Sequence, residues 1–385
     1  MKPMGAIPAE FRDLPLTIGG RTVSEFTAQT PAFVYDFGVV ASRIARFRAA
    51  FPGVDLHYAV KANPFGPLLA AMAPLVDGFD NPRSFAGPGK RDAELEAAIS
   101  AGVTINLESA GEADRALAIA DRLGVAPKLA VRVNPEFELR GSGMRMGGRA
   151  SPFGVDAEQA PALVKRIIAA GADWRGFHIF AGSQALDVAA IIDSQAHTLD
   201  LAERLTDAAG TAPPLVNLGG GFGIPYFPGE LPIDIEIIGE ALRPRLGALS
   251  ETRFAIELGR WLVGEAGVYL TRVVDRKESR GETFLVCDGG LNHQLAATGN
   301  LGTVVRRNYP VAVAAAEPGV QTETVTVVGP LCTPLDRLAD QVELPIAHPG
   351  DVIAVFMAGA YGLSASPWEF LGHPRPVEIL TASVA

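Results

Sequence analysis

Lys61 is the residue whose place in the sequence most clearly raises a question of chemistry. It follows a β-type apolar segment, 57–60, and apolar residues resume at 64–65. A lysine at the inner end of a strand is costly, because burial of an ammonium ion must be offset by pairing or by deprotonation. A neutral amine is what Schiff-base chemistry requires. Taken alone, Lys61 fits a solvated lysine in a strand-to-helix loop better, so its partners decide its role.

Two further segments could bind an anion. Residues 219–223 hold four glycines, and residues 257–260 combine Glu257, Gly259 and Arg260. Glycines let backbone N–H groups approach a phosphate closely, and an arginine adds a bidentate clamp. The alternatives are a plain turn at 219–223 and a simple ion pair between Glu257 and Arg260.

Together these groups indicate a cofactor. Pyridoxal phosphate (PLP) needs a Schiff-base lysine, a phosphate site and a partner for its ring nitrogen. Lys61, the glycines with Arg260, and Glu257 could supply the three in turn. A carboxylate keeps the ring nitrogen protonated, so that the ring stabilises a carbanion at the substrate Cα. We expect no metal, because none of the six histidines is spaced with a second histidine or a cysteine as in a zinc site.

The elements that must position these residues alternate between strand and helix. The periodicity predicts strands at 56–62, 76–80, 84–87, 103–108, 128–134, 175–181, 215–219 and 253–257, and helices at 66–75, 90–101, 111–123, 157–170, 187–208 and 234–248. Eight strands alternating with helices predict an α/β fold, a (β/α)8 barrel of the TIM type. An open doubly wound sheet is the alternative, but no Gly-x-Gly-x-x-Gly follows the first strand.

Functional groups of such barrels sit where strands end. Strand ends in this sequence carry Lys61, Asp80, Arg132, Asn134, His178, Phe180, the Gly182-Ser183-Gln184 run, Gly219–Gly223 and Glu257–Arg260. The last two clusters follow the seventh and eighth strands, which is the usual phosphate site of this architecture.

One connection does not fit the barrel. Only residues 81–83 separate the strand ending at Asp80 from the one starting near Ser84, whereas parallel neighbours need a crossover of about a dozen residues or more. Either these are not separate parallel strands, or about one helix-plus-loop unit is absent from the sequence. We favour the second explanation, such as a disordered stretch left out of the chain.

The predicted secondary structure changes after Arg260. Residues 267–274, 283–288, 303–310, 322–328 and 351–356 are β-rich with turn signals, and the first 31 residues are polar with many prolines. We therefore predict a barrel at 32–262 and an antiparallel β-domain made of 1–31 and 263–385.

Composition excludes several classes of function. The net charge is −10 without a basic cluster, which argues against nucleic acids and anionic membranes as partners. The sequence has neither an apolar run of transmembrane length nor the apolar core of a signal peptide. Two cysteines, Cys287 and Cys332, suit a reducing compartment. We expect a cytoplasmic enzyme of small-molecule metabolism.

The motifs in order resemble the fold-type III PLP-dependent decarboxylases, the group of diaminopimelate, ornithine and arginine decarboxylases. They are Tyr58-Ala59-Val60-Lys61-Ala62-Asn63, Phe85–Lys90, Gly182-Ser183-Gln184, Gly219–Gly223, Glu257-x-Gly259-Arg260, Gly329-Pro330-x-Cys332 and Gly359-Ala360-Tyr361, and they span nearly the whole chain. The resemblance implies an alanine racemase-like barrel with a C-terminal β-barrel, α-decarboxylation of an amino acid, and a homodimer with shared active sites.

The resemblance also implies roles for single residues. Lys61 would carry the Schiff base, Glu257 would contact the pyridinium, and Cys332 of the second subunit would protonate Cα after carbon dioxide leaves. Arg132 would lie on the side of the ring hydroxyl, and Asp80 near Lys61. The phosphate would be surrounded by Ser183, Gly220, Gly221, Gly259, Arg260 and Tyr361.

The sequence departs from the family in three places. The family's strand-end Val-Ala-Ser-type motif and the following helix are missing after Asp80. Phe180 occupies the place of the ring-stacking histidine, and His178 lies two residues earlier on the same strand face, as a cofactor contact or a core histidine. After Cys332 the family places an acid that binds the substrate's distal amine, whereas this chain has Thr333; Asp336 could substitute only in a rearranged loop.

Three further runs narrow the resemblance. Cys332–Asp336, Phe177–Gln184 and Ala358–Pro367 resemble decarboxylases associated with exosortase clusters and with specialised biosynthesis. Some of these act on amino acids carried on a larger group, including a carrier protein. The substrate is therefore expected to be a free or carrier-linked amino acid. The alternatives are an amino-acid racemase, against which Glu257 argues, and a non-enzymatic PLP-binding protein, which would resemble a barrel without the β-domain.

Overall fold

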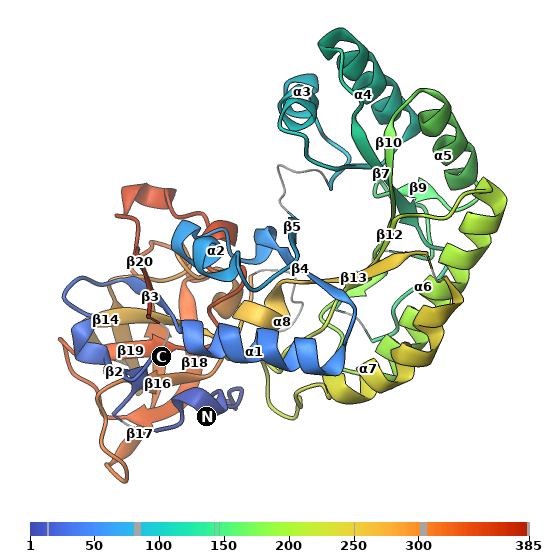
Figure 1. The fold of residues 1–385 in the computed structure, drawn as a ribbon. Helices are drawn as coiled ribbons and strands as arrows, with labels where there is room; N and C mark the ends of the chain where they lie inside the picture. The colour runs from blue at the N-terminus through green and yellow to red at the C-terminus, as the bar shows by residue number, and fades with distance from the viewer. Residues whose placement is uncertain are drawn as a thin grey trace.

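A computed structural model describes residues 1–13, 15–80, 86–141, 143–145, 147–249, 251–300 and 306–382. The chain forms a curled parallel sheet with helices on its outer side and, beside it, a β-domain that holds both described ends of the chain (Figure 1). No helix in these ranges has the length and apolar character needed to cross a membrane.

The parallel sheet confirms the predicted alternation of strands and helices. Its strands run in the order β5 (Gly78–Asp80), β4 (Asp55–Ala59), β13 (Arg253–Leu258), β12 (Leu215–Gly220), β10 (Asp173–Ile179), β7 (Lys128–Asn134) and β6 (Ile105–Leu107), with β9 (Val155–Asp156) beside β7. The helices are α1 (Phe37–Ala50), α2 (Gly66–Met72), α3 (Asp92–Ser100), α4 (Ala110–Leu123), α5 (Ala160–Ala169), α6 (Val188–Ala209) and α7 (Ile235–Leu242).

Local sequence explains these elements. β7 and β13 are buried almost along their whole length, as expected for strands between a barrel interior and a layer of helices. The side chains of Asp36, Ser109 and Asp187 cap α1, α4 and α6 by accepting backbone N–H bonds of the first turn. Gly124 and Gly210 end α4 and α6 in the left-handed conformation.

The sheet is open between β5 and β6, which are its two edges (Figure 1). The strand predicted at 84–87 is not observed where it can be checked: residues 86 and 87 are outside any strand, and residues 81–85 lie outside the described part of the chain. The explanation favoured from the sequence, that about one helix-plus-loop unit is absent here, falls on residues 81–85 and lies outside the described residues. The predicted barrel is present as a curled sheet that is open between β5 and β6.

The β-domain is built around one long strand, β14 (Gly267–Ser279). The sheet order is β16 (Val311–Val313), β19 (Val352–Val355), β14, β15 (Glu282–Cys287), β17 (Thr322–Val328) and β18 (Arg337–Pro345), and β3 (Ala32–Tyr35) pairs with both β14 and β20 (Val377–Leu380). Two of these pairings, β15 with β17 and β3 with β20, are parallel. The prediction of a purely antiparallel domain is therefore wrong, and β3, assigned to the barrel by its place in the sequence, pairs within the β-domain.

Shorter elements complete the described chain. They are the hairpin β1 (Thr17–Ile18) and β2 (Arg21–Thr22), the pair β8 (Met144–Arg145) and β11 (Gly182–Ser183), α8 (Arg260–Val263), and 3-10 turns at Ala9–Phe11, Val23–Glu25, Val60–Ala62, Arg243–Ala248, Ala296–Thr298, Leu363–Ala365 and Phe370–Gly372. Of the strand predicted at 303–310, residues 301–305 lie outside the described residues, and Asn308 forms only an isolated bridge with Met4.

The two parts are joined at the loop that carries Lys61. The backbone N–H of Tyr361 donates to the carbonyl of Ala62 at 2.8 Å. Gly359 packs so tightly on Val263 and Gly267 that a Cβ there would collide with backbone. The apolar core continues through this joint without a break. The β-domain therefore places Tyr361 directly beside the end of β4.

Candidate active site

Lys61 lies in a 3-10 turn directly after β4. Asn63 fixes that turn: its side chain donates to the carbonyl of Gly359 at 2.9 Å and accepts the N–H of Phe65 at 3.0 Å, while its own carbonyl accepts the Tyr58 hydroxyl at 3.0 Å. The neighbours Val60 and Ala62 are buried, but the Lys61 side chain is 47% exposed. The backbone is therefore held rigidly while the amine stays accessible.

The amine of Lys61 faces a carboxylate. Its Nζ lies 3.7 Å from Oε1 of Glu257, which ends the neighbouring strand β13, and 5.3 Å from the centre of the Phe180 ring. Burial opposes the charge, but Glu257 together with Tyr361 and Asp80 outweighs it and raises the pKa of Lys61 above its ordinary value. Lys61 is therefore paired rather than deprotonated in the chain without cofactor. The alternative of a merely solvated lysine is wrong.

Glu257 is the centre of a buried polar group. Its Oε2 lies 3.1 Å from Nε2 of His178 and 3.5 Å from Nδ2 of Asn217. Burial alone would raise the pKa of Glu257, but the hydrogen bond with His178 and the charge of Lys61 hold it well below its ordinary value. The alternative pairing of Glu257 with Arg260 is wrong, because Glu257 pairs with Lys61 and His178 instead.

Asp80 joins this group from the end of β5. Burial and the neighbouring Glu257 carboxylate raise the pKa of Asp80 well above its ordinary value. Two carboxyls that share a site cannot both ionise readily, so the raised pKa of Asp80 and the lowered pKa of Glu257 favour the negative charge on Glu257. The expectation that Asp80 lies near Lys61 matches this placement.

His178 and Phe180 have different surroundings on the same strand. His178 is buried and bonds to Glu257, and its Nδ1 has no hydrogen-bond partner among the described residues. It is therefore more than a core histidine. Phe180 is half-buried and presents its ring to the Lys61 amine.

Arg260 begins the short helix α8 and is enclosed by aromatic rings. It donates to the Tyr226 hydroxyl at 2.8 Å, and its guanidinium carbon lies 4.6 Å from the centre of the Tyr361 ring. Among the ion pairs of the described residues, none involves Arg260. A half-buried cation without a carboxylate suits a phosphate. Tyr226 was not among the predicted site residues, and it lies 34 residues before Arg260 in the sequence.

The predicted glycines bring the remaining phosphate candidates together. Gly219 and Gly221 have left-handed φ of 69° and 84°. A Cβ on Gly220 would collide with the carbonyl of Glu257, and one on Gly221 with that of Gly182, the residue before Ser183. A Cβ on Gly259 would lie 2.8 Å from that of Ala62. The glycines thus pack the ends of β12, β13 and β11 against one another, so residues 219–223 are more than a plain turn.

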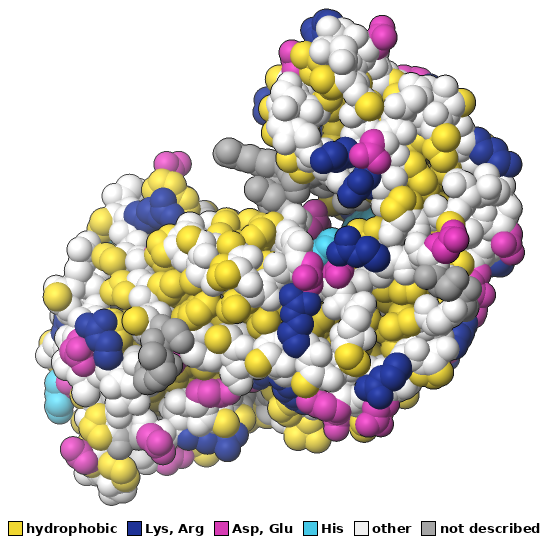
Figure 2. All heavy atoms as spheres, viewed as in Figure 1, with side chains coloured by type: hydrophobic (Ala, Val, Ile, Leu, Met, Phe, Trp, Pro, Cys, Tyr) yellow, Lys and Arg dark blue, Asp and Glu magenta, His cyan; other side chains and the backbone are white. Residues whose placement is uncertain are grey.

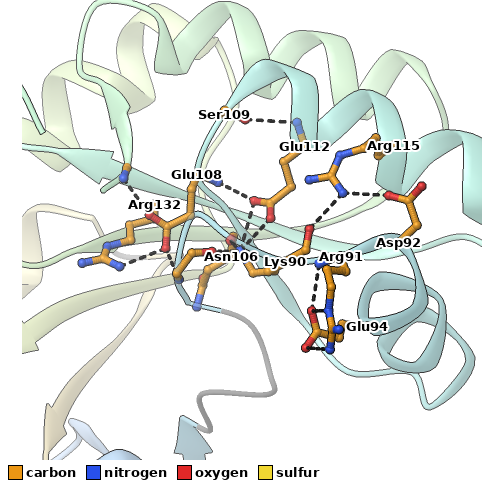
Figure 3. A network of polar contacts seen from close by, with 12 residues as sticks. Lys90, Arg91, Asp92, Glu94, Asn106, Glu108, Ser109, Glu112, Arg115 and Arg132 are labelled. Atoms are coloured by element: carbon orange, nitrogen blue, oxygen red, sulfur yellow. Dashed lines mark hydrogen bonds and ion pairs between the residues drawn. The ribbon is translucent and has the colours of Figure 1, made fainter. Parts of the chain in front are cut away.

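Arg132 is the cross-strand partner of His178 between β7 and β10, and its positive charge opposes the rise in the pKa of Lys61 and of Asp80. Its partner is Glu108, whose Oε1 accepts from the guanidinium at 2.9 Å (Figure 3). Glu108 was not among the predicted site residues. An acidic residue at the end of a predicted strand, 103–108, was the available signal.

Cys332 and Thr333 lie in the loop after β17. Cys332 is exposed, and within the described residues of one chain no contact links it to Lys61. Asp336 is only 2% exposed, and its carboxylate accepts the N–H groups of Leu291 at 2.6 Å and Leu331 at 2.9 Å. The expectation that Asp336 contacts the substrate does not fit this geometry, because its carboxylate oxygens already accept backbone N–H groups. Thr333 and Cys332 keep their predicted roles as proposals.

The residues present fit PLP. They offer an accessible amine, a carboxylate of lowered pKa held by His178, and a half-buried cation beside glycine-rich strand ends. Figure 2 shows that the molecule is hollowed between the lobe of α3 and α4 and the rest, with charged and histidine side chains at the bottom of the hollow. No cluster of three or more potential metal ligands occurs in the described ranges.

Comparisons with known proteins agree with this site. Residues 32–359 match the family described as "Pyridoxal-dependent decarboxylase, C-terminal sheet domain". The L-glutamyl-(BtrI acyl-carrier protein) decarboxylase of Niallia circulans is 34% identical, over 91% of this chain and 89% of the relative. The diaminopimelate decarboxylase of Methanothermobacter thermautotrophicus is 32% identical, over 95% of this chain and 90% of its own.

Solved structures extend the match to the fold. AQ1208 from Aquifex aeolicus superposes with a TM-score of 0.84 at 27% identity and covers 98% of this chain and 93% of its own. Helicobacter pylori diaminopimelate decarboxylase with L-lysine gives 0.80 at 25% identity, with 94% of each chain covered. The relatives are decarboxylases, which supports neither a racemase nor a non-enzymatic binding protein. The chain therefore belongs to the pyridoxal-dependent decarboxylases, carboxy-lyases that use PLP to decarboxylate amino acids or their derivatives.

Proposed function

We propose that this decarboxylase acts on an amino acid attached to a larger group, such as a carrier protein, rather than on a free diamino acid. The observation that carries the proposal is the segment after Cys332. Thr333 is neutral, and the Asp336 carboxylate is engaged by backbone N–H groups. Residues 329–337 therefore offer no free carboxylate for the distal ammonium of a diamino acid.

The charge beside this loop supports the same substrate class. Arg306 donates to the carbonyl of Leu335 at 3.2 Å, and Asn300 donates to the same oxygen at 3.3 Å. In the part of the chain that the structure describes, no ion pair involves Arg306. A cation at this place repels an ammonium group and favours an acyl, carboxylate or phosphate group. The name of the Niallia circulans relative, an L-glutamyl carrier-protein decarboxylase, agrees with this preference.

The residues around Lys61 would divide the chemical work. When bound, PLP supplies an electron sink for the electron pair left on Cα as carbon dioxide departs. Lys61 would hold the cofactor through its amine. Glu257, whose pKa is held low by His178 and Lys61, would keep the ring nitrogen protonated.

A second group of residues would hold the phosphate. Arg260 supplies the charge, oriented by the Tyr226 hydroxyl and the Tyr361 ring. The backbone N–H groups of Gly220 and Gly221 add neutral donors at the same strand ends. Because β-domain residue Tyr361 takes part, the cofactor would bind at the joint between the two parts of the chain.

Cys332 would deliver the proton to Cα from the second subunit of a dimer. Its thiol is exposed, whereas that of Cys287 is fully buried. A thiol donor must stay free of disulfides, which requires a reducing compartment such as the cytoplasm. An active site completed by a second copy agrees with the absence of a Cys332–Lys61 contact within the described residues of one chain.

The substrate proposal is tested by comparing carrier-linked and free amino acids. We expect L-glutamyl carrier protein to lose carbon dioxide, detected by mass spectrometry of the carrier, with a kcat/KM at least about tenfold above that of free glutamate, lysine, ornithine or diaminopimelate. The unloaded carrier protein serves as the control. A free diamino acid that outperforms the carrier-linked substrate would refute the proposal.

The shared site is tested by mixing two inactive variants. Lys61→Ala and Cys332→Ala remove residues that would meet only across the interface. Mixed dimers should regain activity, because one of their two sites contains both residues intact. If mixtures of the variants, after unfolding and refolding together, stay as inactive as each variant alone, Cys332 does not act across subunits.

A further inference from the structure

The guanidinium of Arg132 is oriented by one carboxylate, that of Glu108. Glu108 is buried at the end of β6, and its Oε1 accepts from Nη1 of Arg132 at 2.9 Å (Figure 3). Both side chains are almost fully buried: 1% of the Glu108 side chain and 9% of the Arg132 side chain are exposed. Arg132 is the cross-strand partner of His178, which bonds to Glu257, and its charge opposes the rise in the pKa of Lys61 and Asp80. The pair therefore lies beside the candidate active site.

Glu108 is itself fixed by neighbours from two other segments. Its Oε1 also accepts the N–H of Gly87, and its Oε2 accepts the N–H of Gly154 at 2.7 Å. The guanidinium of Arg132 lies 5.2 Å from the ring of Phe153, the residue before Gly154. Glu108 thus holds Arg132 on one side while the Phe153 ring covers the other, which leaves the arginine little freedom.

We propose that Glu108 is a positioning residue that aims Arg132 at the bound cofactor and thereby sets the affinity for PLP. Glu108 does not touch the cofactor in this proposal and acts only through Arg132. The inference depends on PLP binding, which the family establishes, and not on the identity of the substrate. It therefore stands or falls separately from the proposed carrier-linked substrate.

The physical reason is the direction of a planar group. A guanidinium offers donors in a fixed fork, so a carboxylate on one edge decides where the other edge points. Backbone N–H groups hold the Glu108 carboxylate at both oxygens, and they lower its pKa together with Arg132 against the effect of burial. Removal of its charge leaves Arg132 buried without a counter-ion, and the guanidinium turns toward other acceptors.

The same network contains a matched control. The amine of Lys90 donates to both oxygens of Glu112, at 2.9 and 3.0 Å, and the Glu112 carboxylate also accepts the N–H of Glu108 at 2.8 Å. Glu112 is as buried as Glu108 but makes no contact with Arg132 in the described residues. Glu112→Gln therefore perturbs the same network without touching the arginine.

The test measures the affinity of the full-length chain for PLP after removal of the cofactor. PLP is titrated into wild type, Glu108→Gln, Glu112→Gln, Arg132→Gln and the double variant Glu108→Gln/Arg132→Gln, with absorbance of the bound cofactor as the readout. We expect Glu108→Gln to weaken PLP binding about tenfold. Glu112→Gln should change the affinity less than about twofold, even where it lowers the melting temperature.

The double variant separates positioning from a general loss of structure. If Glu108 acts through Arg132, the Glu108→Gln change has no further effect on PLP affinity when Arg132 is already Gln. Unchanged affinity in Glu108→Gln, an equal loss in Glu112→Gln, or an undiminished effect in the Arg132→Gln background would each overturn the proposal. If Glu108→Gln does not fold, Glu108→Asp, which keeps the charge but shortens the reach, is read in the same cycle.

Discussion

Two lysine–glutamate pairs in the barrel part of the chain differ in how many N–H donors of the lysine remain free to bind a ligand. The Lys90 amine donates to both oxygens of Glu112 and to the carbonyls of Gly87 and Asn106, all at 2.9–3.0 Å, and its side chain is 7% exposed. The Lys61 amine lies 3.7 Å from one oxygen of Glu257, is 47% exposed, and makes no hydrogen bond within the described residues. An ammonium has three donors; those of Lys90 are engaged and those of Lys61 are open to a ligand.

The pKa directions alone would have suggested the opposite assignment. Burial lowers the pKa of Lys90, whereas the Glu257 carboxylate raises that of Lys61 above its ordinary value. A lysine with a lowered pKa inside a protein is a common mark of catalysis. In this molecule the lowered pKa belongs to a structural lysine, and the reactive one is recognised by accessibility and free donors.

The largest expected effect separates the two lysines. Lys61→Ala should abolish decarboxylation, a loss on the order of 10³-fold or more, and remove the visible absorbance of the lysine-bound cofactor. Lys90→Ala should keep that absorbance in the protein that remains folded, because its amine is committed to Glu112. Spectra of both variants with added PLP, recorded beside circular dichroism, check this. An unchanged spectrum in Lys61→Ala would remove the basis for the assignment of the site.

The structural pair should show its importance in stability instead. Lys90→Met leaves Glu112 charged and buried, at 2% side-chain exposure, and should lower the free energy of unfolding by about 3–5 kcal/mol. The double variant Lys90→Met/Glu112→Leu should recover most of that loss, because it buries no unpaired charge. Urea denaturation of the three proteins measures both effects. A double variant as unstable as Lys90→Met would show that the bonds to Gly87 and Asn106 matter more than the charge pair.

The contrast also shows what could be predicted from the sequence. Lys61, Glu257 and Arg260 were found because polar residues at strand ends of a barrel converge on one face, which depends only on alternation and spacing. The connection after Asp80 was recognised as too short for a crossover helix, but the open edge of the sheet at this place was not predicted.

Other contacts could not be derived, because they depend on packing. The bonds of Glu108 to Arg132, and of Asp336 to Leu291, join residues 24 and 45 positions apart. The motif following Cys332 suggested Asp336 as a substrate residue, but backbone N–H groups that no pattern reveals had already engaged it. The pairing of β3 within the β-domain was missed for the same reason, since pattern gives a strand but not its partner.

The smallest expected effect concerns Asp80, the third ionisable group at the Lys61 pair. Burial and Glu257 raise the pKa of Asp80 well above its ordinary value, so the folded chain keeps a proton that the unfolded chain loses above about pH 4. The stability from this proton is complete below about pH 4 and is lost as the pH rises toward the raised pKa. Asp80→Asn stays neutral at every pH and retains an N–H donor for Glu257.

The variant should therefore gain on wild type as the pH increases. We expect Asp80→Asn to be more stable by about 1 kcal/mol near pH 8, with the difference shrinking toward pH 4. Urea denaturation without added cofactor, at a series of pH values, measures this trend. Asp77→Asn, which removes the ion pair of Asp77 with Arg48 just before β5, is the control. A difference that is constant with pH would mean that Asp80 is ionised in the folded chain. Two carboxylates, Glu257 and Asp80, would then face Lys61 instead of one, and the contrast with the neutralised Lys90 pair would be sharper still.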